Sequence, residues 1–113
     1  MVVAGFVPEA LMPALYAQAQ ALVCASRYEG FGMPVLEARA CGTRVLVADT
    51  PELREAGGEH AIVVEPSFEG LREGLRRAVD LRPLVEPGLA ERSSWRRRAS
   101  LLAARLAPRY ALP

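Results

Sequence analysis

Two glutamates, Glu29 and Glu37, stand eight residues apart on either side of a Gly-Phe-Gly turn, and Pro34 follows the turn. Glycine adopts positive φ at no steric cost, so the backbone at residues 30–32 can approach a ligand closely. Proline is favoured at the first position of a helix. The pattern therefore predicts a strand-to-helix corner whose free N–H groups, over residues 31–35, bind an anion such as a phosphate.

A carboxylate beside such an anion site can accept hydrogen bonds from a pair of sugar hydroxyls. If the helix starts at Pro34, Glu37 lies at the end of its first turn and is placed for this task. The residue types then indicate a site for a sugar attached to a phosphate. A second interpretation stays open, because Gly-x-Gly before a helix is common: a tight turn with a solvated glutamate on either side.

Residues 26–38 closely resemble the signature of glycosyltransferase family 4, a family of nucleotide-sugar-dependent, retaining enzymes of GT-B fold with a Glu-x7-Glu pair. The resemblance extends over nearly the whole chain. The flanking matches, in order, are Gly5-Phe6-Val7, Leu15-Tyr16, Ala40-Cys41-Gly42, Val45, Pro51-Glu52-Leu53, Gly57-Gly58, Ala61, Pro66, Ser94-Trp95, Arg98-Ala99 and Tyr110.

The resemblance implies a role for each matching residue. Glu29 would be the catalytic glutamate that sits by the transferred sugar and steadies its developing charge, and Glu37 would hold the ribose hydroxyls. Val7 would border the base through its backbone. The turn that meets the sugar hydroxyls and the diphosphate through its N–H groups matches Gly30, Phe31, Gly32 and Met33. No cofactor or metal is implied, and catalysis would rest on positioning and electrostatic stabilisation.

At 113 residues the chain is one domain. Family members have two Rossmann-like domains, so residues 1–113 are expected to form a single partial donor-binding domain, the C-terminal part. Its expected partners are a nucleotide-sugar donor and a missing acceptor-binding domain or partner chain.

The family's basic pair for the diphosphate would precede Gly5, and Arg27 and Arg44 are the nearest basic residues here. We therefore expect weak donor binding and little or no transfer by this chain alone. The alternative is a non-catalytic, truncated α/β module that keeps the fold and self-associates.

Composition narrows the function classes. The net charge of +1 argues against nucleic-acid binding, for which a strongly basic face is expected. With no targeting segment, a cytoplasmic location is expected, with Cys24 and Cys41 reduced. No apolar run reaches the roughly 18 residues of a membrane span, so membrane contact is not expected. The one histidine, His60, and the two cysteines lack metal-ligand spacing, so no metal site is expected.

Strands alternating with helices favour a parallel sheet covered on both faces. We predict an α/β fold, a Rossmann-like parallel sheet of about four strands with flanking helices. An apolar sheet edge would be exposed, so a homodimer or an exchange of elements through that edge is expected. In the first helix the apolar stripe is expected at Leu11, Ala14, Leu15, Gln18 and Ala19, with Gln18 as a polar interruption. The expected strands are 2–7, 21–25, 44–48 and 61–64, and the expected helices are 10–19, 34–40, 51–56, 68–81 (capped by Ser67) and 94–110.

Overall fold

The computed structural model describes residues 1–81, and the helix predicted over 94–110 lies outside them. None of the described helices is long and apolar enough to cross a membrane. Within residues 1–81 a 3-10 turn is followed by four helices and three strands: η1 (Glu9–Leu11), α1 (Met12–Gln18), β1 (Ala21–Cys24), α2 (Met33–Ala40), β2 (Arg44–Ala48), α3 (Pro51–Gly57), β3 (Ile62–Val64) and α4 (Phe68–Asp80).

The three strands form one parallel sheet in the order β1-β2-β3. The register places Cys24 opposite Val47, and Val47 opposite Val63. The carboxyl ends of all three strands therefore lie together, at the carboxyl edge of the sheet. In open α/β sheets that edge is the one at which ligands bind.

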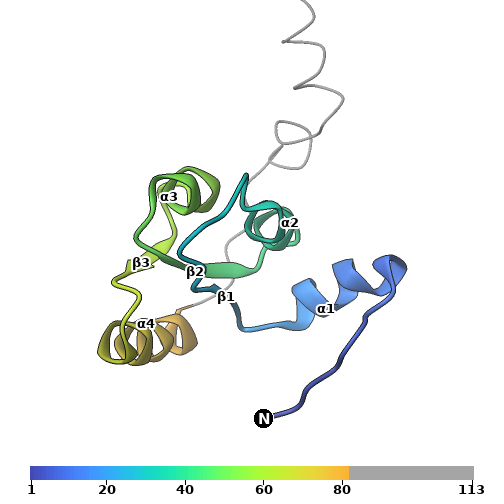
Figure 1. Ribbon diagram of the computed structural model, residues 1–113. Coiled ribbons are helices and arrows are strands. Elements are labelled where there is room, and N and C mark those ends of the chain that lie inside the picture. Colours follow the sequence, from blue (N-terminus) through green and yellow to red (C-terminus); the bar gives the residue numbers. More distant parts are fainter. Residues whose placement is uncertain (82–113) are drawn as a thin grey trace, which may run out of the picture.

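Helices cover both faces of the sheet, as Figure 1 shows, with α2 and α3 on one side and α4 on the other. The core splits accordingly. Val45 and Val47 of β2 pack with α2 and α3, whereas Leu46 packs with β3 and with Ala78 of α4. Alternate side chains of β2 point to opposite faces, so this almost wholly buried strand is apolar along most of its length.

Short polar residues begin two of the helices, and Ser67 is the cap that the sequence predicted. The Thr50 side chain accepts a hydrogen bond from the Leu53 amide (3.3 Å), and the Ser67 side chain accepts one from the Gly70 amide (3.1 Å). Each bond satisfies an N–H group that the first helical turn leaves unpaired. At the end of α2, Gly42 takes positive φ (79°), the conformation expected of a glycine after a helix.

The strand predicted over residues 2–7 does not form, and the sheet has three strands in the described part of the chain rather than four. A strand exists only where a neighbour pairs its N–H and C=O groups. This segment pairs with no strand of residues 1–81, and its apolar side chains stand in solvent, with Val2, Val3 and Phe6 between 84% and 91% exposed. Figure 1 shows it as an arm running away from the sheet beside α1.

The apolar stripe predicted for the first helix was wrong. Leu11 and Leu15 are 57% and 52% exposed, while Tyr16 is buried at 6% and Met12 is half-buried. Met12 and Tyr16 are four residues apart and share the helix face that packs on α2. The helix is also shorter than predicted, since residues 9–11 form a 3-10 turn before Pro13, near the start of α1.

Candidate functional site

The Gly-Phe-Gly turn joins the end of β1 to the start of α2. Gly32 is the N-cap of α2 and takes the left-handed conformation (φ 61°, ψ 40°) that favours glycine. A Cβ on Gly32 would stand 2.7 Å from the Ala56 Cβ of α3, which is closer than side chains approach one another. Glycine is therefore required here both by the backbone angle and by the packing of α3 against the turn.

The amides at the start of α2 are only partly available for an anion. Val35 and Leu36 both donate to the Gly32 carbonyl, at 2.9 and 3.1 Å, and Pro34 has no N–H. The N–H groups of Gly32 and Met33 have no protein acceptor within residues 1–81. Fewer amides are therefore available to an anion at the start of α2 than the prediction over residues 31–35 assumed.

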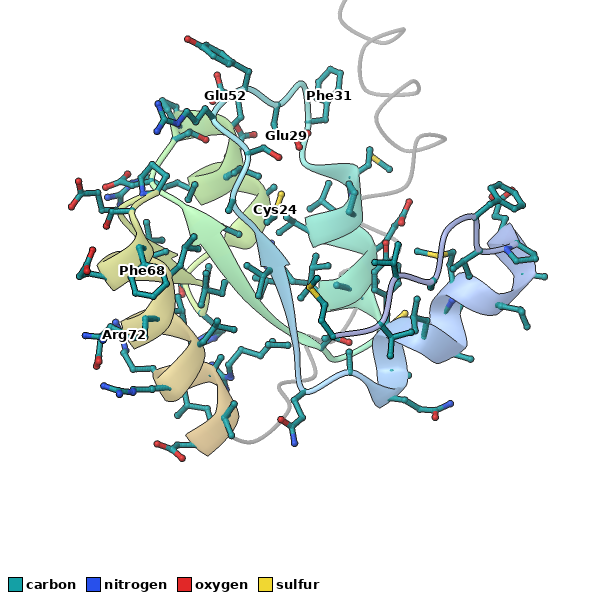
Figure 2. The ribbon with its side chains drawn as sticks, turned by 60° about the horizontal axis from the view of Figure 1, so that its bottom comes forward. Cys24, Glu29, Phe31, Glu52, Phe68 and Arg72 are labelled. Carbon is teal, nitrogen blue, oxygen red and sulfur yellow. The ribbon has the colours of Figure 1, made fainter. Side chains whose placement is uncertain are left out.

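Glu29 lies just beyond the carboxyl end of β1, with the Phe31 side chain beside it at the edge of the fold (Figure 2). Its Oε1 is 3.9 Å from the Cys24 Sγ at the end of the strand, and it is half-buried, whereas the Phe31 side chain is 61% exposed. Figure 2 also shows Glu52, from the start of α3, near this edge. The first glutamate therefore occupies the sheet edge at which ligands bind.

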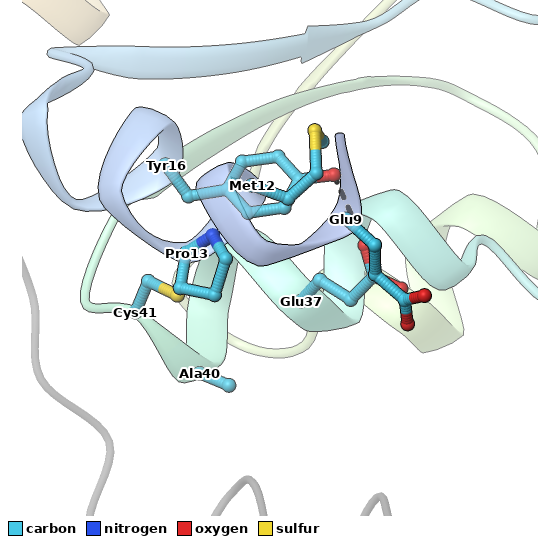
Figure 3. A pocket seen from close by; sticks show the side chains of 7 residues that line it. All are labelled: Glu9, Met12, Pro13, Tyr16, Glu37, Ala40 and Cys41. Atoms are coloured by element: carbon cyan, nitrogen blue, oxygen red, sulfur yellow. Dashed lines mark hydrogen bonds between the residues drawn. The ribbon is translucent and has the colours of Figure 1, made fainter. Parts of the chain in front are cut away.

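Glu37 lies on α2, four residues after its first residue, Met33, rather than at the end of the first turn. Its Oε2 accepts a hydrogen bond of 3.1 Å from the Tyr16 hydroxyl of α1 (Figure 3). Burial, followed by this hydrogen bond and the negative charge of Glu37, raises the pKa of Tyr16 to about 12. Tyr16 is therefore a neutral hydroxyl donor at physiological pH.

An open pocket of ≈ 310 Å³ lies between α1 and α2, and Tyr16 and Glu37 both line it (Figure 3). Its other lining residues come from η1, from the start of α1 and from the end of α2: Glu9, Met12, Pro13, Ala40 and Cys41. Apolar groups dominate the lining. Two carboxylates, Glu9 and Glu37, provide acceptors at the side of an otherwise apolar hollow.

The structure keeps Glu29 and Gly30, Phe31, Gly32 and Met33 together in one corner, since they are neighbours in sequence. Val7 is half-buried and lies two residues before Glu9, so its segment reaches the pocket that Glu37 lines. Arg44 lies at the far side: it begins β2 and pairs with Ala21, at the opposite edge of the sheet from the corner. Arg44 is thus excluded as a phosphate contact at this corner, while Arg27 is exposed in the loop after β1.

Tyr16 is the residue that the sequence interpretation missed. It was noted only as part of the Leu15-Tyr16 match, with the buried face of the helix assigned to Leu11 and Leu15. Its spacing from Met12 is the signal that identifies it, because residues four apart share a helix face. No set of three or more His, Cys, Asp or Glu side chains within residues 1–81 is arranged to hold a metal ion.

Comparison with known proteins identifies relatives for most of the chain. The family described as glycosyl transferases group 1 matches residues 1–99. O-antigen chain mannosyltransferase B of Escherichia coli is 43% identical over 63 residues, which cover 56% of this chain and 16% of that protein. O-antigen chain mannosyltransferase RfbU of Salmonella typhimurium is 46% identical over 55 residues, covering 49% of this chain and 16% of that protein.

A relative named for a different activity is also similar. Mannosylfructose-phosphate synthase of Agrobacterium fabrum is 39% identical over 64 residues, covering 55% of this chain and 14% of that protein. The chain thus matches 14% to 16% of the length of these three relatives. No solved structure matches.

Proposed function

The chain belongs to the family of glycosyl transferases group 1, and from that membership we propose that it supplies the donor-binding part of a retaining glycosyltransferase of family 4. In this proposal residues 1–113 are a single, C-terminal part of a GT-B donor domain. The sugar moves from a nucleotide-sugar to an acceptor that a separate domain or partner chain holds. The relatives named above extend far beyond the matched segment, which supports a need for such a second part.

We propose mannose as the sugar that is transferred. The two relatives from Escherichia coli and Salmonella typhimurium are named mannosyltransferases, and the third is named a mannosylfructose-phosphate synthase. All three names contain the term mannosyl. Two of the names refer to an O-antigen chain and the third to mannosylfructose phosphate, so the names agree on no acceptor and none is proposed for this chain.

The observation that carries the proposal is the corner between β1 and α2. It combines a left-handed Gly32 closely packed on α3, two amides that have no acceptor within residues 1–81, and Glu29 over the end of a parallel strand. Amides at a helix start attract the diphosphate, because they carry the positive end of the helix dipole. Glu29 then stands beside the sugar, where a carboxylate stabilises positive charge at the transferred carbon.

The other proposed contacts come from the turn itself, from α2 and from the segment before Glu9. Glu37 accepts hydrogen bonds from the ribose hydroxyls, and the Val7 backbone borders the base. Gly30, Phe31, Gly32 and Met33 meet the sugar hydroxyls and the diphosphate through their backbone. Within residues 1–81 the carboxylates near the site, Glu9, Glu29 and Glu37, oppose a dianionic ligand, so we expect its compensating cations to come from another part of the enzyme.

Calorimetric titration with UDP, GDP and their mannose conjugates tests the proposal. We expect binding at micromolar to low-millimolar strength, lost in Glu37→Ala. The matched control is Glu73→Ala, which removes another exposed glutamate, from α4 on the far side of the sheet. Binding by neither nucleotide, or equal losses in the two variants, would contradict the proposal.

A second candidate function is a non-catalytic α/β module that associates with a further copy of itself. One observation favours it. The outer edge of β1 pairs with no strand of residues 1–81, and the apolar arm before Val7 is exposed. Unpaired strand edges invite pairing with another chain. Self-association without nucleotide binding would support this candidate over the first.

A further inference from the structure

Tyr16 and Glu37 form a pair that joins a fixed side chain to a solvent-exposed one. Tyr16 is 6% exposed, whereas Glu37 is exposed to solvent, and 3.1 Å separates the Tyr16 hydroxyl from the Glu37 Oε2. An exposed glutamate on a helix ordinarily samples several rotamers and loses that freedom when it binds a ligand. A hydrogen bond from a fixed donor removes much of that freedom beforehand.

The ring and the backbone of Tyr16 are both held in place, and together they fix the position of its hydroxyl. Its ring belongs to the core cluster that also holds Val35 and Leu36 of α2. Its carbonyl oxygen accepts hydrogen bonds from the Thr43 hydroxyl and from the Ala19 amide. Tyrosine has only two side-chain torsions between backbone and ring, so these constraints leave the hydroxyl at one point against α2.

The bond leaves Glu37 able to receive a ligand. Tyr16 occupies Oε2, and no hydrogen-bond donor within residues 1–81 contacts Oε1. A carboxylate oxygen can accept more than one hydrogen bond, so both oxygens can still meet a pair of hydroxyls. The raised pKa of Tyr16 keeps its proton in place at the pH of the reaction, which makes it a permanent donor to Glu37.

We propose that Tyr16 is a positioning residue whose hydroxyl holds the Glu37 carboxylate in the orientation that receives the ribose hydroxyls of the donor. The inference rests on the proposed function, because it needs Glu37 to bind ribose. Orientation fixed before binding lowers the ordering cost that the ligand would otherwise meet. Tyr16 acts through Glu37 and makes no contact with the reacting atoms.

Tyr16→Phe tests the inference, since it keeps the buried ring and removes only the hydroxyl. The probes are UDP and GDP, each beside its 2′,3′-dideoxy analogue, titrated into the full chain by calorimetry. For the nucleotide that binds, we expect the variant to weaken affinity about threefold to tenfold, the range for one lost hydrogen bond. We expect no weakening for the dideoxy analogue, because the hydroxyls that Glu37 would hold are absent.

One further variant, beside the dideoxy analogues, separates positioning from a structural role. Tyr28→Phe makes the same chemical change at a side chain that is 94% exposed, and it should leave affinity as in the wild type. Equal weakening of both the ribose and dideoxy ligands would assign Tyr16 a structural role and overturn the inference.

Each outcome tells the inference apart from the proposed function. If the wild type binds neither UDP nor GDP, both fail. If the wild type binds and Glu37→Ala does not, while Tyr16→Phe binds as the wild type, only the positioning role fails. A variant that does not fold leaves a measurement on the wild type: three-bond NMR couplings of the Glu37 side chain without nucleotide. One dominant rotamer supports the inference, and averaging over rotamers overturns it.

Discussion

Gly32 at the start of α2 and Ala56 in α3 approach so closely that a Cβ added to Gly32 would lie 2.7 Å from the Ala56 Cβ. This approach holds the Gly-Phe-Gly corner against α3, which begins right after β2. The corner, α2 and α3 therefore form one packed unit above the carboxyl edge of the sheet. Displacing the corner requires α3 to move as well.

Gly32→Ala is expected to destabilise the fold by about 2–5 kcal/mol. About 1–2 kcal/mol comes from placing a side chain in the left-handed conformation, and the remainder, about 1–3 kcal/mol, from overpacking against α3. Gly30→Ala is the matched control, because a Cβ there meets no atom of residues 1–81 within 4 Å and the residue has no positive φ. Urea unfolding of both variants measures the difference. Equal free energies of unfolding would show that the corner accommodates the added methyl group without loss of stability.

Gly74→Ala is expected to destabilise the fold by about 1–3 kcal/mol although alanine is the better helix former, because overpacking outweighs the gain in helix propensity. An added Cβ would lie 2.5 Å from the Leu46 Cδ1 and 2.7 Å from the Val64 Cγ1, so α4 would have to lift from the sheet. Glu73→Ala, one position earlier and exposed, is the control and should change stability by less than about 0.5 kcal/mol. A more stable Gly74→Ala would contradict the close packing of α4.

Stability should fall between about pH 10 and pH 12 through Tyr16. Its pKa is raised from 10.0 to about 12, chiefly by burial and then by Glu37. The folded state therefore keeps a proton that the unfolded chain releases above pH 10. The stabilisation is complete below pH 10 and is lost as the pH rises through 12. The measurement is the difference in the free energy of urea unfolding between the wild type and Tyr16→Phe at each pH. Other groups titrate equally in these two proteins, so their contributions cancel in the difference.

That difference should fall steadily from pH 9 to pH 12, and near pH 12 Tyr16→Phe should be the more stable protein, because the wild type must then bury an ionised tyrosine or protonate it. At pH 9 the wild type should be more stable by about 1 kcal/mol, the net value of one hydrogen bond to an exposed acceptor. A difference that stays constant over this range would mean that Tyr16 ionises equally in the folded and unfolded states. The hydrogen bond to Glu37 would then contribute nothing to holding its proton.

Local signals predicted the elements whose boundaries depend on near neighbours in sequence. Thr50 and Ser67 mark the starts of α3 and α4, and the apolar run of β2 has the predicted bounds of Arg44–Ala48. These features need only a capping side chain or burial on both faces. The Glu-x7-Glu corner was likewise located correctly between a strand and a helix, because glycine and proline determine the backbone there.

The failures concern partners that are distant in sequence. The apolar arm before Val7 has the composition of a strand, but pairing needs a neighbour, and composition does not supply one. The inward face of α1 was misassigned because Leu11 and Leu15 are more hydrophobic than Tyr16. Tyr16 can be buried because its hydroxyl has a hydrogen-bond partner in Glu37, 21 residues away. A pairing over that distance cannot be predicted from local sequence.

Self-association through the edge of β1 is expected at high concentration. That edge has no pairing strand within residues 1–81, and Val23, in the middle of β1, is 41% exposed. A strand from a second copy would satisfy the free N–H and C=O groups and cover this side chain. We expect a dimer in sedimentation equilibrium of the wild type and a monomer for Val23→Lys, since lysine on an edge strand opposes pairing.

Val79→Lys is the control for this prediction, because Val79 is also apolar and is 60% exposed, but lies on α4. It should leave the dimer intact if the sheet edge is the interface. A monomeric Val79→Lys beside a dimeric Val23→Lys would instead place the interface on α4. A wild type that stays monomeric at high concentration would contradict association through either surface, and the second candidate function would lose its supporting observation.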